Sequence, residues 1–207
     1  MQTMRSALRG LGLLGAMLLS GCASGPGIPD TTYFRLPEPA APERIATPLN
    51  APLVVETFLA DGVHSDQAIL YSTDPDGDRL RAYHYQLWVY PPTRMLQRRL
   101  IRYLDEAGAA TAVLDRLPPR GDQYRLYLRI EAFERVRTLS GWEVRVRLDA
   151  RLDQGGGLLP LIKKRYDRRV QVDEGIRDSV VAMGQVLDDI YAELAHDVAQ
   201  VRPATQP

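Results

Sequence analysis

The chain of 207 residues contains a single cysteine, Cys22, so no disulfide can form within it. Its 26 basic and 26 acidic side chains leave no net charge. A nucleic-acid-binding domain would need a strongly basic surface, and this balance argues against one. The fold must depend on packing alone, in a chain whose 45% hydrophobic and 25% charged residues are typical of a globular domain.

The chain also has few side chains in arrangements that carry out chemistry. Its three histidines, His64, His84 and His196, do not have the spacing of metal ligands, and no serine lies in a nucleophile-elbow sequence. The acidic turn Asp74–Asp78 lacks the twelve-residue spacing and the closing Glu of a calcium loop, which favours a solvated hairpin. We therefore expect no enzyme activity, no metal and no cofactor. Carboxylates that folding brings together remain an alternative.

No apolar run in the chain is long enough to span a bilayer. Residues 1–9 carry Arg5 and Arg9 and no acid, and an apolar stretch of about nine residues follows at 10–18. A positively charged segment followed by a short apolar one is typical of a signal peptide, here predicted over residues 1–21.

The residues after this apolar stretch, Leu19, Ser20, Gly21 and Cys22, resemble a bacterial lipobox. The resemblance implies that the Cys22 thiol is linked to diacylglycerol, that the peptide is cut before Cys22, and that the new amine is acylated, for example with palmitate. A thiolate is the side-chain nucleophile best suited to such a linkage. Ala23 stands where an Asp would imply retention at the inner membrane, so the expected location is the periplasmic face of the outer membrane. An incidental cysteine in an ordinary signal peptide is the alternative.

Proline-rich sequence follows the cysteine and predicts a linker over residues 22–52. Fully extended, it would reach about 100 Å. Within it, residues 33–36 form a short β-like stretch that could pair with the edge of a sheet. The folded domain is predicted over residues 53–201, with a flexible tail at 202–207.

Two patterns of apolar residues predict the elements of this domain. Alternation with period two predicts strands, and steps of three and four residues predict helices. The expected strands are 53–58, 68–72, 79–89, 111–114, 124–133, 142–153 and 161–172, and the expected helices are 91–107 and 173–201. This order predicts one α+β domain with a twisted, mostly antiparallel sheet and two α-helices packed on one face.

The polar face of that sheet is predicted to be densely charged. Basic residues alternate there with acidic ones: Arg125, Arg129, Arg145, Arg147 and Arg151 with Glu131, Glu143, Asp149 and Asp153. Cross-strand ion pairs on a wet surface explain this pattern. A docking face for a protein partner is the alternative.

With its elements placed, the chain resembles the ABC-type transport auxiliary lipoproteins, a PqiC-like family. The resemblance lies in Tyr33–Leu36, in strands at 53–58 and 68–71, in Tyr85–Pro92 running straight into a helix, and in the long C-terminal helix. The Asp74–Asp78 turn is longer than the family's usual one.

This resemblance implies a non-enzymatic, outer-membrane component of an intermembrane lipid transport system. Its partners would be an MCE-domain protein and the ABC transporter of the same system, and copies of the chain could form a ring. The resemblance implies no cofactor beyond the lipid on Cys22. Two other functions stay open, a lipoprotein activator of a peptidoglycan synthase and a lipid-tethered periplasmic hydrolase.

Overall fold

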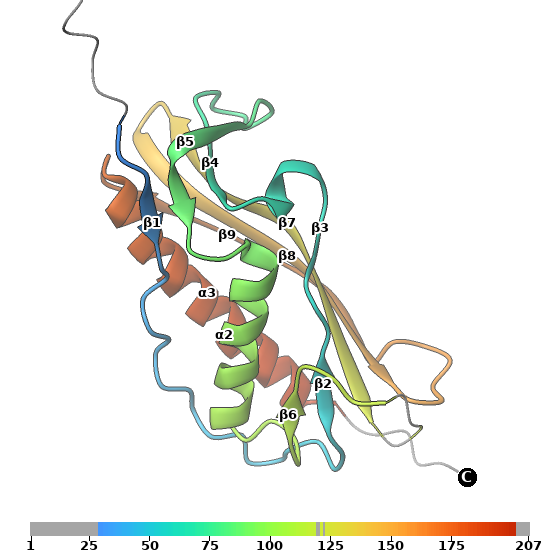
Figure 1. The fold of residues 1–207 in the computed structure, drawn as a ribbon. Helices are drawn as coiled ribbons and strands as arrows, with labels where there is room; N and C mark the ends of the chain where they lie inside the picture. The colour runs from blue at the N-terminus through green and yellow to red at the C-terminus, as the bar shows by residue number, and fades with distance from the viewer. Residues whose placement is uncertain (1–28, 119–120, 122, 202–207) are drawn as a thin grey trace, which may run out of the picture. The chain divides into compact units, whose positions relative to one another are not determined.

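The structure, a computed structural model, describes residues 29–118, 121 and 123–201. From Thr31 onward they belong to one compact unit. A curled sheet carries two helices, α2 (Pro92–Glu106) and α3 (Ile176–Ala199), on one of its faces (Figure 1). The fold class is α+β, as the sequence predicted.

Three long antiparallel strands form the frame of the sheet: β7 (Tyr124–Thr138), β8 (Gly141–Gln154) and β9 (Ile162–Val172). Their alternating pattern turns apolar side chains toward the helices, and these are almost inaccessible to solvent: Leu126, Leu128, Leu148 and Leu152 are each at most 1% exposed. The register of β7 against β8 shifts between Ile130 and Ala132. Beyond the shift it is Phe133, predicted on the polar side, that pairs with Val146 and lies in the core. A bulge of this kind moves every later side chain to the other face.

Six short strands complete a mixed sheet. They are β1 (Thr32–Phe34), β2 (Leu53–Val55), β3 (Leu59–Ala60), β4 (Ala68–Ser72), β5 (Arg81–Trp88) and β6 (Val113–Leu114). β2, β3 and β4 run parallel to β7, β1 runs parallel to β5, and β2 runs parallel to β6. The expected strand 53–58 is thus shortened to β2, whereas β3 lies just beyond its predicted end and is followed by a 3-10 helix, η1 (Gly62–Ser65). Period two predicts a strand and its faces but not its direction, so the parallel pairings were not predicted.

Helix α2 begins and ends close to the predicted boundaries. Pro92 occupies its first turn, where a missing N–H costs no hydrogen bond. At its end Gly108 has φ 69°, and the Ala109 N–H donates to the Leu104 carbonyl at 2.9 Å. This is a Schellman end, which requires a left-handed residue and so favours glycine.

Helix α3 begins at Ile176, three residues later than predicted. Before it, the Glu174 carbonyl accepts a hydrogen bond from the Arg135 guanidinium at 2.6 Å instead of entering the helix. The predicted apolar stripe is buried: Val180, Met183, Leu187, Ile190, Leu194 and Val198 are each at most 4% exposed. The Tyr191 hydroxyl donates to the Leu96 carbonyl at 3.1 Å and so joins α3 to α2.

Residues 31–52, predicted as part of the linker, lie against the folded domain. β1 pairs with β5, and the Ile45 and Leu49 N–H groups donate to the carbonyls of Ala107 and Ala109 at 2.9 Å. Leu49 is 3% exposed and belongs to the core. Proline prevents a regular hydrogen-bond ladder but allows an extended chain to pack on helices. Between the expected lipidation site and the compact unit there remain only residues 23–30.

A buried arginine on α2 holds this N-terminal segment in place. The Arg99 guanidinium donates to the carbonyls of Pro37 and Gly184 and pairs with Asp188 on α3 at 2.7 Å. The Asp188 carboxylate also accepts a hydrogen bond from the Ala40 N–H at 3.0 Å. This ion pair, whose arginine is buried, therefore joins both helices to the segment that approaches them from the N-terminus.

The Gly184→Ala variant is expected to loosen that segment. A Cβ at Gly184 would lie 2.9 Å from Cδ of Pro37, closer than the two carbons can approach. Gly→Ala in a helix usually increases stability by up to about 1 kcal/mol, and here that increase should be lost. Amide hydrogen exchange of residues 38–45 should become faster. Pro37→Ala in the same variant is the control, because removing the ring relieves the contact and should restore slow exchange. Unchanged exchange in Gly184→Ala would contradict the packing of Pro37 on α3.

Candidate functional site on the outer face of the sheet

The three histidines weighed as metal ligands in the sequence do not lie together in the described part of the chain. The lipobox, Leu19, Ser20, Gly21 and Cys22, lies outside the described residues. His64 in η1 faces Glu134 at 3.1 Å, whereas His84 lies on β5 and His196 in the last turn of α3. Within residues 29–118, 121 and 123–201, no three His, Cys, Asp or Glu side chains are placed to hold a metal ion.

The acidic turn at Asp74–Asp78 folds over the outer face of the sheet. The Asp74 N–H donates to the Ser72 hydroxyl at 3.0 Å, and its carboxylate pairs with Arg79 at 3.4 Å. Gly77 has φ 77° and lies beside Arg145, since an added Cβ would be 3.5 Å from the Arg145 guanidinium. The turn therefore lies over a basic side chain of β8.

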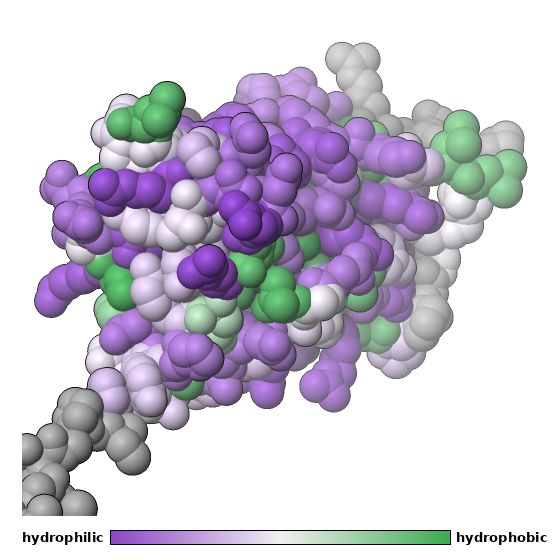
Figure 2. Space-filling view, turned by 90° about the horizontal axis from the view of Figure 1, so that it is seen from above, coloured by the Kyte–Doolittle hydropathy of each residue, from purple (hydrophilic) through white to green (hydrophobic). Residues whose placement is uncertain are grey.

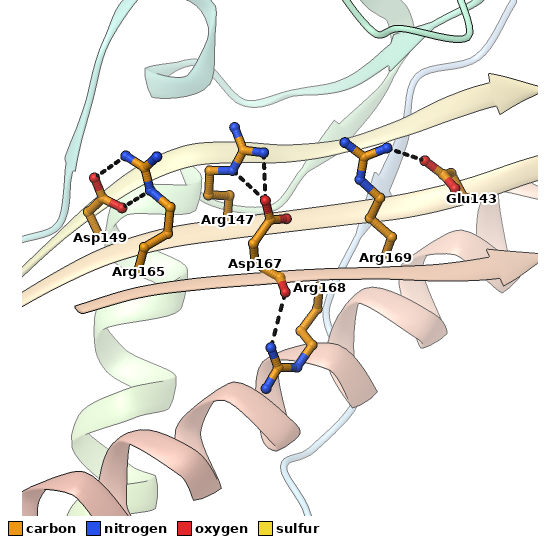
Figure 3. A network of polar contacts seen from close by, with 7 residues as sticks. All are labelled: Glu143, Arg147, Asp149, Arg165, Asp167, Arg168 and Arg169. Atoms are coloured by element: carbon orange, nitrogen blue, oxygen red, sulfur yellow. Dashed lines mark hydrogen bonds and ion pairs between the residues drawn. The ribbon is translucent and has the colours of Figure 1, made fainter.

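Ion pairs between β8 and β9 cover the face that the helices leave free (Figure 3). Arg165 pairs with Asp149 through two hydrogen bonds of 2.6 and 2.8 Å. Arg147 donates two to one oxygen of Asp167, at 2.8 and 2.5 Å. Arg169 pairs with Glu143 at 3.4 Å. Cross-strand ion pairs were expected on this face, but each of these three joins a predicted residue of β8 to a residue of β9 that was not predicted there. Each pair stabilises the sheet by about 0.2–1 kcal/mol.

Asp149 lies among several arginines of this face. Its hydrogen bonds from Arg165 lower the pKa of the Asp149 carboxyl below its ordinary value, and the charges of Arg165, Arg147 and Arg129 act in the same direction. Asp149 is thus held ionised between arginines of three strands. The basic partners on β9 were not among the residues predicted for this face, because the alternation of residues 161–172 is weaker.

A groove of about 800 Å³ crosses the same face between β3, β7, β8 and β9. Its lining includes Leu59 and Tyr127, the cations Arg129, Arg151, Lys163 and Arg165, and the carboxylates Asp149 and Asp153. Arg129 pairs with Asp61 at 2.6 Å and Arg151 with Asp153 at 2.7 Å. Among the described residues, Lys163 has no carboxylate within ion-pair distance. The arrangement suits the binding of an anion better than acid–base chemistry, which needs a pair of groups with separated pKa values.

A second buried cation lies on the helix side of the sheet. Arg135 is 1% exposed, donates to the Glu174 carbonyl, and stacks 4.0 Å from the centre of the Trp142 ring. Burial lowers the pKa of Arg135 and raises that of Tyr83, whose hydroxyl accepts from it at 3.4 Å. These contacts anchor the start of α3 to the sheet, so we assign them to the fold.

One end of the unit is mainly hydrophilic. Figure 2 shows the end that is uppermost in Figure 1, where hydrophilic side chains predominate and hydrophobic ones stand in small separate groups. None of the helices in the described part of the chain is long and apolar enough to cross a membrane.

Comparison with known families gives one match across most of the chain. The family described as the ABC-type transport auxiliary lipoprotein component matches residues 34–195. The match includes β4, β5, α2 and the three long strands. No curated protein matches the sequence.

Solved structures with the same fold share little sequence with this chain. A Xanthomonas campestris protein is 21% identical with a TM-score of 0.66, over 79% of this chain and 92% of its own. An uncharacterized protein is 20% identical with a TM-score of 0.66, over 82% of this chain and 99% of its own. A hypothetical protein from Chlamydia trachomatis is 7% identical with a TM-score of 0.51, over 73% and 97%. At these identities the likeness shows the fold alone.

Proposed function

Because this chain belongs to the family of ABC-type transport auxiliary lipoprotein components, we propose that it is the outer-membrane component of an intermembrane lipid transport system. The observation that carries the proposal is the family match over residues 34–195, which extends through the sheet and most of α3. The partners would be an MCE-domain protein and the ABC transporter of the same system. The described residues hold the chain's charged groups largely in ion pairs, which suits a binding component with no catalytic role.

The short tether supports a function close to the membrane. With a lipid on Cys22, residues 23–30 allow Thr31 to lie at most about 30 Å from the anchor. The free linker that the sequence suggested would have reached about three times as far. An activator of a peptidoglycan synthase must extend from the outer membrane to the cell wall, so the packing of residues 31–52 on α2 and α3 favours the transport function.

The free edge of β9 suits self-association into a ring. Among the described strands, β9 pairs only with β8, so the outer edge of its 11 residues has no strand partner. Unpaired strand edges are templates for pairing with another chain. Native mass spectrometry of the purified protein should give one oligomer of defined size, and a monomer at all concentrations would contradict the ring.

Crosslinking in intact cells tests the proposed partners. Cells that express the chain with a C-terminal tag are crosslinked, and proteins attached to it are identified after denaturing purification. We expect an MCE-domain protein together with ABC transporter subunits, and neither in a parallel sample from an unrelated tagged outer-membrane lipoprotein. Recovery of a peptidoglycan synthase in their place would overturn the proposal.

A further inference from the structure

The loop between β8 and β9 presents apolar side chains to solvent. Residues 155–162 are three glycines followed by Leu, Leu, Pro, Leu and Ile, and they contain no charged side chain, although 25% of the chain is charged. Leu158 is 100% exposed and Leu159 is 80% exposed. A run of consecutive apolar residues at the surface is unusual in a folded domain unless it has a function, and often marks a surface that another molecule covers.

The backbone at both ends of this loop is fixed by hydrogen bonds. Gly156 has φ 77°, a left-handed conformation that favours glycine, and the Gly157 N–H donates to the Gln154 carbonyl at 3.0 Å. Where the chain returns to the sheet, the Leu161 N–H donates to the Leu152 carbonyl at 2.7 Å. The two exposed leucines are therefore held at the tip of a closed hairpin, and they do not belong to a frayed end of the chain.

The loop and the start of the compact unit lie at opposite ends of the sheet (Figure 1). The chain enters the unit at Thr31, and β1 joins the sheet through β5 and β4, which pairs with Glu134–Val136 of β7. The loop follows Gln154, which lies opposite Tyr124 at the other end of β7. Roughly ten residues of strand, or about 35 Å, separate these two levels.

This position directs the loop away from the membrane. With the lipid on Cys22 that the proposed function includes, residues 23–30 keep Thr31 within about 30 Å of the anchor. A unit held by a short tether at one end presents its other end to the periplasm. The leucines at that end are therefore available to a periplasmic protein.

Association of copies through β9 would leave the loop uncovered. Hydrogen bonds between strands run across the strands, so copies paired through the free edge of β9 would lie side by side. The loop lies at the end of the strands, so every copy in such a ring would present it on the same face of the assembly. This geometry favours a different protein as the occupant, in preference to a second copy.

We propose that the β8–β9 loop is the surface on which the transport partner docks, with Leu158 and Leu159 buried in an apolar pocket of that protein. A cavity of about 400 Å³ adjoins the loop where the chain returns into β9, and its lining includes Leu161, Ile162 and Val201. It offers the same partner a recess at the end of α3. The inference deepens the proposed function and rests on it for the identity of the partner.

Photocrosslinking at single positions in intact cells tests the docking surface. A photoreactive benzoylphenylalanine is placed at position 158 of the full-length tagged chain, and in a second strain at position 139. Leu139 is the matched control, because it is also 100% exposed, at the tip of the hairpin at the opposite end of β8. We expect position 158 to capture the MCE-domain protein and position 139 not to capture it. Equal capture at both positions, capture at neither, or capture of a second copy at position 158 would overturn the proposal.

Replacing both leucines measures their share of the contact. In the double variant Leu158→Ser, Leu159→Ser, recovery of the MCE-domain protein by chemical crosslinking should fall about tenfold or more, because the apolar burial is lost. Leu139→Ser should stay within about twofold of the unmodified chain. Both variants should melt like the unmodified chain, since all three leucines are exposed. Undiminished recovery in the double variant would contradict the docking role.

The chemical crosslinking of the unmodified chain separates this inference from the proposed function. If it recovers the MCE-domain protein and position 158 does not, the docking surface is wrong and the proposed function stands. If it recovers a peptidoglycan synthase, and position 158 captures that synthase while position 139 does not, the proposed function is wrong and the loop remains the docking surface.

Discussion

The Leu187→Asp variant is expected to unfold at a temperature at least about 10 °C lower, or not to fold at all. Leu187 is 0% exposed at the middle of α3, within the core between that helix and the sheet. Removing a buried Leu side chain costs about 2–5 kcal/mol, and the buried carboxylate adds a desolvation cost. The free energy of unfolding of such a domain is about 5–15 kcal/mol in total, so the substitution removes a large part of it.

Val181→Asp on the same helix is the control for this prediction. Val181 is 39% exposed, so its variant makes a similar chemical change where water can solvate the carboxylate. Its melting temperature, followed by circular dichroism, should stay within about 2–4 °C of the unmodified chain. If the Leu187→Asp protein had the same melting temperature as the Val181→Asp control, α3 would not pack on the sheet.

The parts of the fold that were predicted correctly depend on local pattern. The alternation in residues 124–130 and 142–153 gave the faces of β7 and β8, because each strand has one buried and one wet side. Apolar residues at steps of three and four predicted both helices, and Gly108 predicted the end of α2. In each case the neighbouring residues in the sequence contain the signal.

The parts that were missed depend on contacts between distant segments. A proline-rich chain has the same composition whether it is free or packed, so the contact of Pro37 with Arg99 and Gly184 left no local signal. The register shift at Ile130 also has no signal in the local sequence, and it reversed the expected faces of β7 beyond that point. The acidic and basic residues of β8 were foreseen, whereas their partners on β9 followed only from the register of the two strands.

The candidate groove combines both kinds of information. Arg129 and Arg151 were predicted on the polar face, and Lys163 lies in a strand whose faces the sequence left unclear. Only the register shows that Arg151, which pairs with Asp153, lies directly opposite Lys163. The placement of these two cations beside one another is therefore a property of the folded sheet.

The Cys22→Ala variant is expected to lose lipid attachment completely. Cys22 is the only cysteine of the chain, so no other thiol can accept diacylglycerol. In cells fed radioactive palmitate, the unmodified chain should give a labelled band and the variant none. Ser24→Ala is the control, because it changes the same region without removing the thiol, and it should label normally.

The same variant also tests whether the anchor and the folded unit are independent. The compact unit begins at Thr31, so the melting temperature of residues 31–207 should be the same in Cys22→Ala as in the unmodified chain. Each acyl methylene buried in a bilayer contributes about 0.8 kcal/mol, so two or three chains form a durable anchor without any contact from the domain. A labelled Cys22→Ala band would contradict the lipobox. An unlabelled variant that melts normally would separate the two roles, with Cys22 keeping the protein at the membrane and the sheet and helices providing the surfaces that meet its partners.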